Sequence, residues 1–414
     1  MKRIIASASL LALGISGTQA AGMVASLPAN KPWSISASLR GFYDDNPALL
    51  NESFKPQDSF GFDVSPSIGV NWNSGQTTFN AGYAYTFRYY DNRPQPGSTD
   101  NSSVDHVHVF NMALMHAFTE RFSIDMHDQF VISQEPTLVS PAGTPFVSPS
   151  GSASYNDGGV NFHIQATRLL EIVLGYQNLF FDYDNPVSSV ILDRMEHTGK
   201  VDFRWQVTPQ TVAVLGYQYK VVDYLKDAIP PFVNPSFPFG FDPSQNNNRA
   251  HIVTVGLDHN FNPSLFGSFR VGGQWTDYYN NPTAGDELSP YADASLRYTY
   301  RPNSFVQTGF KYARSQTDAS AIDAATTYLY ATLHHGFTPQ FAGELTGGMQ
   351  NSDYNGGAAD SLSDWIYYLD FNLAYHFTPN FAATMDYKYD LVDSDIANRG
   401  YQRNRVFLGV TASY

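Results

Sequence analysis

The chain has 414 residues, no cysteine and a formal charge of −14, and 15% of its residues are aromatic. The acidic balance argues against nucleic acid as a partner, and without disulfides the fold must be held by hydrogen bonds and packing. No run of about 18 apolar residues occurs, which excludes a transmembrane helix. The mean hydropathy of −0.29 does not exclude a membrane protein whose strands alternate apolar and polar residues.

The first twenty residues predict a secretory signal peptide. Lys2 and Arg3 precede the apolar run Ile4–Ile15, and Thr18-Gln19-Ala20 supplies small residues for cleavage near Ala20. The alternative is a buried N-terminal helix. Loss of the two cations with the peptide would change the formal charge from −14 to −16.

Strands with period-two alternation begin directly after a short leader at residues 21–33. The pattern predicts a first strand at Ser34–Tyr43 and, after a loop, an antiparallel pair at Phe60–Trp72 and Thr77–Tyr90. Asn73-Ser74-Gly75 forms the turn between the two paired strands. Alternation places apolar and aromatic residues on one face of the sheet and polar residues on the other.

The same hairpin recurs along the chain, which makes it an internal repeat. Further short turns are predicted at Thr119-Glu120-Arg121, near Thr167-Arg168, and at Thr208-Pro209-Gln210, Asn262-Pro263-Ser264, Arg301-Pro302-Asn303, Thr338-Pro339-Gln340 and Thr378-Pro379-Asn380. The connections at the opposite strand ends are longer and rich in Pro, Gly, Ser and Asp. The two most conspicuous are Glu135–Ser154 and Tyr224–Arg249.

The clearest hairpin is Ile366–Leu391, and the last strand is Gln402–Tyr414. The short turns and the two terminal strands together give about 18 strands, with 16 as the fallback. Short turns at one end and long loops at the other are typical of outer-membrane barrels. We therefore predict an all-β fold: residues 34–414 form one antiparallel up-and-down transmembrane β-barrel, after a signal peptide at 1–20 and a periplasmic leader at 21–33.

The apolar face of this sheet needs a cover, and no helical pattern long enough to supply one is present. Closure into a barrel pairs every strand and leaves lipid to cover the outer face. Aromatic residues near both strand ends fit an interfacial girdle. The alternative is a water-soluble all-β protein such as a propeller or a solenoid.

Several segments together resemble a family of bacterial outer-membrane β-barrel porins. They are Tyr43-Asp44-Asp45-Asn46, the strand with Ser65-Pro66-Ser67, Tyr83-Ala84-Tyr85 with Tyr89-Tyr90-Asp91, and Asp105-His106 with His116-Ala117-Phe118. The resemblance is clearest over residues 34–136. The final strand is similar to the family's C-terminal membrane-insertion signal, with Gly409 and Tyr414 at the matching positions. Some members of the family are associated with exopolysaccharide export gene clusters, so the resemblance implies either a porin or an export pore.

If the apolar residues face lipid, the alternate residues line a pore. The predicted pore-lining charges are Arg40, Asp63, Arg88, Asp125, Lys200, Asp202, Arg204, Lys220, Asp258, Arg270, Asp293, Arg297, Lys311, Glu344, Asp370, Asp386, Lys388 and Arg405. A cation facing lipid would cost about 2–4 kcal/mol at the midplane, which supports the inward assignment. The alternative role for most of these charges is pairing between neighbouring strands that holds the wall together.

The two long loops are candidates to fold inward and narrow the pore. The second carries Phe232, Phe237, Phe239 and Phe241 among prolines, and such rings could contact sugars. The alternative is a surface loop that packs on its own aromatic residues.

The leading functional hypothesis is a passive channel for small hydrophilic solutes, and the second is an exit pore for a secreted polysaccharide. An enzyme or adhesin built on a barrel is a third reading. We expect no enzymatic activity and no cofactor, because no nucleophile elbow is visible, and His106 with His108 or His334 with His335 are too few ligands for a metal site. The expected partners are outer-membrane lipid, the barrel assembly machinery and the transported solute. A homotrimer and a monomer both stay open.

Overall fold

The structure is a computed structural model that describes residues 32–93, 103–133, 153–232, 234–236, 239–281, 284–317 and 319–414. The predicted signal peptide, nearly all of the leader and most of the loop Glu135–Ser154 lie outside these residues.

The described residues form eighteen strands, as the count of turns predicts. Their bounds are β1 (Trp33–Asp44), β2 (Ser59–Ser74), β3 (Thr77–Tyr90), β4 (Val104–Ala117), β5 (Phe122–Ser133), β6 (Ala153–Gln165), β7 (Leu170–Tyr183), β8 (Arg194–Thr208), β9 (Thr211–Tyr224), β10 (Asn248–Asn262), β11 (Leu265–Asp277), β12 (Asp286–Arg301), β13 (Ser304–Ser315), β14 (Asp323–Gly336), β15 (Phe341–Asn355), β16 (Ser363–Thr378), β17 (Phe381–Ser394) and β18 (Tyr401–Ser413). The predicted strand Thr77–Tyr90 matches β3 exactly in its bounds, and the first and last predicted strands differ by one residue at each end.

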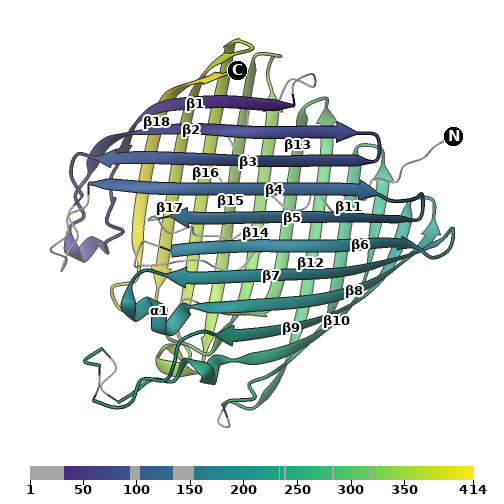
Figure 1. Ribbon diagram of the computed structural model, residues 1–414. Helices are drawn as coiled ribbons and strands as arrows, with labels where there is room; N and C mark the ends of the chain where they lie inside the picture. The colour runs from purple at the N-terminus through teal and green to yellow at the C-terminus, as the bar shows by residue number, and fades with distance from the viewer. Residues whose placement is uncertain are drawn as a thin grey trace.

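Each strand pairs antiparallel with the next, and β1 also pairs with β18, so the sheet closes into a barrel (Figure 1). The closing register aligns Ser36 with Ser413 and Asp44 with Arg405. The first and last strands therefore bring the two ends of the barrel domain to the same rim. The predicted all-β barrel is confirmed.

The connections differ between the two rims as the sequence indicates. The rim opposite the chain ends carries the longer loops and the one helix of more than a single turn in the described chain, α1 (Pro186–Leu192), which the strand pattern does not predict. Asn185 caps α1 by accepting bonds from the backbone N–H groups of Val187 and Ser188. Short 3-10 turns lie at Glu52–Phe54, Pro243–Asn246 and Gly357–Ala359. No helix in the described ranges is both long and apolar enough to cross a membrane.

The two faces of the wall differ in chemistry and exposure. On β10, Val253 and Val255 are more than half exposed, whereas the alternate residues Ile252 and Thr254 are buried. The buried face is the concave one, because side chains from strands that are not neighbours meet there. For example, Arg204 on β8 contacts Asp258 on β10 at 3.0 Å. The exposed apolar face is therefore the outside of the barrel.

Candidate functional site

The predicted pore-lining charges share one face of the wall. Each lies on the face opposite the exposed apolar side chains of its own strand; for example, Lys311 follows the exposed Phe310, and Asp386 follows the exposed Met385. The full set is Arg40, Asp63, Arg88, Asp125, Lys200, Asp202, Arg204, Lys220, Asp258, Arg270, Asp293, Arg297, Lys311, Glu344, Asp370, Asp386, Lys388 and Arg405. The structure does not gather them into one compact site but distributes them around the inner wall.

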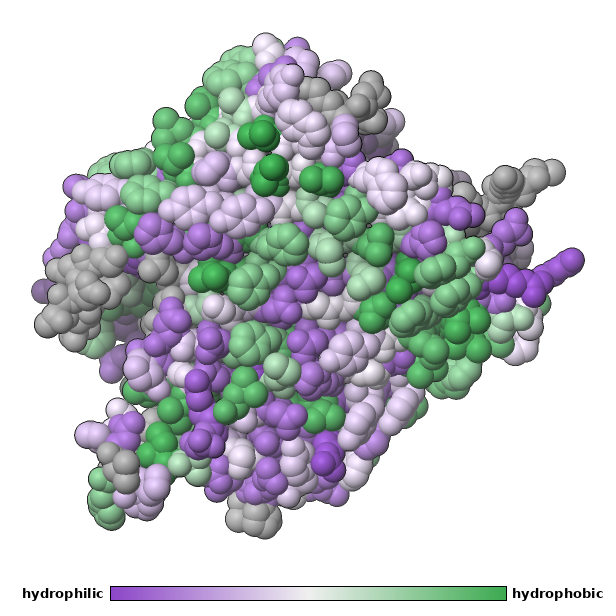
Figure 2. Space-filling view, viewed as in Figure 1, coloured by the Kyte–Doolittle hydropathy of each residue, from purple (hydrophilic) through white to green (hydrophobic). Residues whose placement is uncertain are grey.

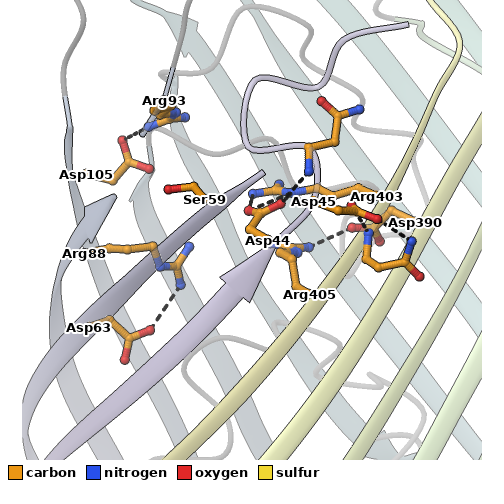
Figure 3. Close-up of polar contacts among 12 residues, drawn as sticks. Asp44, Asp45, Ser59, Asp63, Arg88, Arg93, Asp105, Asp390, Arg403 and Arg405 are labelled. Carbon is orange, nitrogen blue, oxygen red and sulfur yellow. Dashed lines mark hydrogen bonds and ion pairs between the residues drawn. The ribbon is translucent and has the colours of Figure 1, made fainter. Parts of the chain in front are cut away.

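A dense cluster lies where the barrel closes. Asp63 on β2 is fully buried and accepts two bonds from Arg40 on β1, at 2.9 Å to Nε and 2.7 Å to Nη2. Arg88 on β3 approaches the same carboxylate at 3.5 Å (Figure 3), and Arg40 also contacts Asp386 on β17 at 3.3 Å. One carboxylate thus serves two guanidinium groups, which are both buried.

Two aromatic rings pack against these guanidinium groups. Phe407 on β18 is 1% exposed and packs with Phe42 on β1 at a ring distance of 5.4 Å. Arg40 lies 4.8 Å and Arg88 lies 5.5 Å from the Phe407 ring centre. The cation–π contacts with Phe407 compensate for the hydration that the two buried guanidinium groups lose. Such contacts are strongest where water is excluded.

The long-loop rim above this cluster is held by further pairs, of whose members the prediction named Arg405 alone. Arg403 bonds Asp44 through Nε at 3.0 Å, and Arg405 bonds Asp390 at 2.7 Å (Figure 3). Arg93 pairs with Asp105 in the same view. Asp44 and Arg403 have the same parity as Arg40 and Arg405 on their strands, so continuing the alternation to the strand ends would have found them.

A second group of charges spans β8 to β11. Glu196 on β8 is 1% exposed and bridges Arg194 at 2.8 Å and Lys220 at 2.6 Å. Nearer the short-turn rim, Asp258 accepts bonds from both Arg204 and Arg270, at 3.0 and 2.7 Å. Most charges on the inner wall therefore pair between strands, the alternative role that the sequence left open.

A luminal cavity of about 110 Å³ borders this second group. Its lining includes Gln177, Gln218, Gln274 and the charged side chains of Glu196, Lys220 and Lys311. Lys220 and Lys311 belong to the predicted set, whereas the glutamines and Glu196 were not predicted. Amide groups can both donate and accept hydrogen bonds, so this lining can replace the hydration shell of a polar solute.

The aromatic loop candidates lie away from this cavity. Phe232 and Phe239 are each 87% exposed, and the segment extends beyond the strand ends (Figure 1). Phe241 pairs with Ile229 through two backbone hydrogen bonds at 2.7 and 2.9 Å, and Phe237 lies outside the described residues. Phe232 and Phe239 point into solvent, and a constriction by this loop stays a prediction.

The two positions of the predicted insertion signal lie on β18 and at its end. Gly409 leaves room for Arg40: a Cβ at this position would approach Arg40 Cγ to 2.3 Å. Tyr414 is 65% exposed, and its ring lies 5.7 Å from Trp33 at the start of β1. Both residues thus contribute to the seam between the first and last strands.

A closed barrel with an apolar outside and a charged inside defines the class of outer-membrane β-barrels with porin-like architecture. Residues 253–414 match the family model described as "Putative beta-barrel porin 2". The match confirms the resemblance to a porin family. However, it falls on the C-terminal strands rather than on residues 34–136, where the sequence resemblance was judged clearest. No curated protein matches the sequence.

Among solved structures, the chain is similar to OccAB4 of Acinetobacter baumannii, with 11% identity, a TM-score of 0.43, and coverage of 93% of this chain and 99% of that one. It is also similar to OpdK of Pseudomonas aeruginosa, solved with vanillate, with 8% identity, a TM-score of 0.46, and coverage of 92% and 99%. A BenF-like porin of Pseudomonas fluorescens Pf-5 gives 10% identity, a TM-score of 0.46, and coverage of 93% and 99%. Similarity at this level carries no information about the solute.

Proposed function

We propose that the chain forms a passive channel for small hydrophilic solutes in the bacterial outer membrane. The observation that carries the proposal is the cavity on the inner wall, lined by amides and by charges of both signs. A solute passing this wall exchanges bonds with water for bonds with Gln177, Gln218 or Gln274. An apolar solute would gain nothing from the same lining.

Single-channel recording in planar bilayers tests this proposal. We expect discrete conductance steps from purified protein that migrates as a folded barrel on an unheated gel. Heat-unfolded protein from the same preparation is the control and should give no steps. Folded protein that gives no conductance above background would reject the channel.

An exit pore for a secreted polysaccharide is the second candidate, and the exposed rings of Phe232 and Phe239 favour it. The pairing of Ile229 with Phe241 holds this hairpin together. Exposed rings at a pore mouth offer flat apolar surfaces on which sugar rings can stack.

Replacing Phe232 and Phe239 by serine should weaken binding of the secreted polymer by about 1–3 kcal/mol, at roughly 0.5–1.5 kcal/mol for each ring contact. Binding of polymer to protein in nanodiscs, measured by calorimetry, gives this difference. Leu288→Ser is the control, because Leu288 is also a strongly exposed apolar side chain, at 76%. Equal polymer binding by the wild type and the double variant would count against the exit pore.

A further inference from the structure

Polar side chains interrupt the apolar outer wall on four consecutive strands. They are Asp128 on β5, Asn156 on β6, Tyr176 and Asn178 on β7, and His197 on β8, and we call them the lateral patch. Asp128 lies two residues before Phe130, which is 36% exposed, and Tyr176 is itself 45% exposed. Figure 2 shows hydrophilic side chains among hydrophobic ones on the face of the barrel formed by these strands.

The strand register makes the patch continuous. Met112 aligns with Asp128, Asp128 with Gly158, Gly158 with Asn178, and Asn178 with His197, so a single row crosses from β4 to β8. Asn156 lies in the adjacent row, opposite Phe130. The polar groups therefore form one surface and are not scattered individually.

Asp128 lies at the depth of the membrane interior, whereas His197, the twelfth residue of β8 from the short-turn rim, lies toward the long-loop end of the patch. Asp128 is the seventh of the 12 residues of β5, counted from the short-turn rim. Six residues at about 3.3 Å each along a strand tilted by roughly 40° place it about 15 Å above that rim, near the middle of an apolar band about 25 Å tall. It therefore lies too deep for the aromatic girdle or the headgroup region.

Hydrocarbon cannot satisfy these polar groups. Among the described residues, the Asp128 carboxylate accepts one side-chain hydrogen bond, from Asn156 Nδ2 at 3.0 Å. His197 Nδ1 contacts Tyr176 Oη at 2.7 Å and Asn178 Nδ2 at 3.2 Å. A carboxylate has sites for about four hydrogen bonds and lipid tails supply none, so polar residues at this depth usually face protein or water.

Two glycines leave room for close approach beside the patch. A Cβ at Gly199, on the same outer face, would meet no atom within 4 Å, and one at Gly158 would lie 3.0 Å from Asp128 Oδ1. Small residues on a lipid-facing surface allow another backbone to come near.

On the opposite wall, exposed apolar side chains lie beside outward polar ones such as Thr308 on β13 and Tyr387 on β17. The exposed side chains there include Val306, Phe310, Leu329, Leu333 and Leu345. The lateral patch differs from that wall because it places a carboxylate, Asp128, in the middle of a strand.

We propose that the lateral patch is the contact surface for a second copy of this chain within the membrane. Any partner must present hydrogen-bonding groups at mid-membrane depth. A second copy does so automatically, because all copies insert in the same orientation. The patch also carries both an acceptor, the Asp128 carboxylate, and amide and imidazole donors, so two such surfaces can satisfy each other.

Cysteine cross-linking in intact outer membranes tests the contact, and the native chain has no cysteine to interfere. Asn156→Cys, Gly158→Cys and Gly199→Cys are each oxidised with copper phenanthroline. We expect at least one to give a disulfide-linked homodimer. Thr308→Cys on β13, between the exposed Val306 and Phe310, is the matched control and should stay monomeric.

Native mass spectrometry of the full protein gives a second readout that does not depend on cysteine placement. We expect the wild type to be oligomeric, the Asp128→Leu/Asn178→Leu variant to be monomeric, and the control Thr308→Leu/Tyr387→Leu to keep the wild-type mass. Gel mobility of unheated samples shows that each variant has folded. A monomeric wild type, or cross-links only to a protein of another mass, would overturn the proposal.

Discussion

Replacement of Asp63 by alanine should destabilise the barrel by about 3–5 kcal/mol, the usual cost of leaving a buried charge without its partner. Asp63 is fully buried, and Arg40 and Arg88 are 8% and 1% exposed. Neither guanidinium can move into water without disturbing the seam between β1 and β18. Unfolding by urea in lipid vesicles, followed by tryptophan fluorescence, measures the difference.

The control for this prediction is Asp386→Ala. Asp386 contacts Arg40 at 3.3 Å, but its side chain is more exposed, at 14%, and Arg40 keeps its two bonds to Asp63. We therefore expect a smaller loss from this change. If both variants lose the same free energy of unfolding, the burial of Asp63 does not explain how much its ion pairs stabilise the barrel.

Replacement of both Lys220 and Lys311 by glutamine should shift the ion selectivity of the channel toward cations. Both side chains line the cavity. A unit charge about 8 Å from a passing ion in a water-filled lumen contributes about 0.5 kcal/mol, so two charges contribute about 1 kcal/mol, or roughly a fivefold change in the permeability ratio. Reversal potentials across bilayers in a salt gradient measure this ratio.

A matched control removes two lysines from the long-loop rim instead. Lys55 lies in an exposed loop, and the side chain of Lys226 is 42% exposed where it contacts Asp193 at 2.9 Å. Lys55→Gln/Lys226→Gln has the same change in net charge but leaves the cavity intact, so a much smaller shift is expected. An equal shift in both double variants would show that net charge, not the cavity lining, sets selectivity.

The sequence predicted the secondary structure closely because the signals for each hairpin lie within the hairpin itself. Alternation along Thr77–Tyr90 and turn residues are local features. The strand is confirmed, whereas the turn predicted at Asn73-Ser74-Gly75 lies at residues 75–76, because Asn73 and Ser74 still pair within the hairpin. The α1 helix was not predicted, because a helix of seven residues inside a long connection is too short to show a repeat of apolar residues.

The sequence by itself determined which face of the wall each side chain occupies, because period-two geometry follows from the strand alone. It also predicted about 18 strands, with 16 as the fallback, since the short turns leave local signals, and the structure has eighteen in the described residues. Only the tertiary structure decided which charges meet. Arg40 reaches Asp386 across 346 residues, and Arg403 reaches Asp44 across 359, because closure and register bring distant strands together. The lateral patch has the same origin: Asp128 and His197 are polar residues in separate hairpins, and only the alignment of β5 to β8 joins them into one surface.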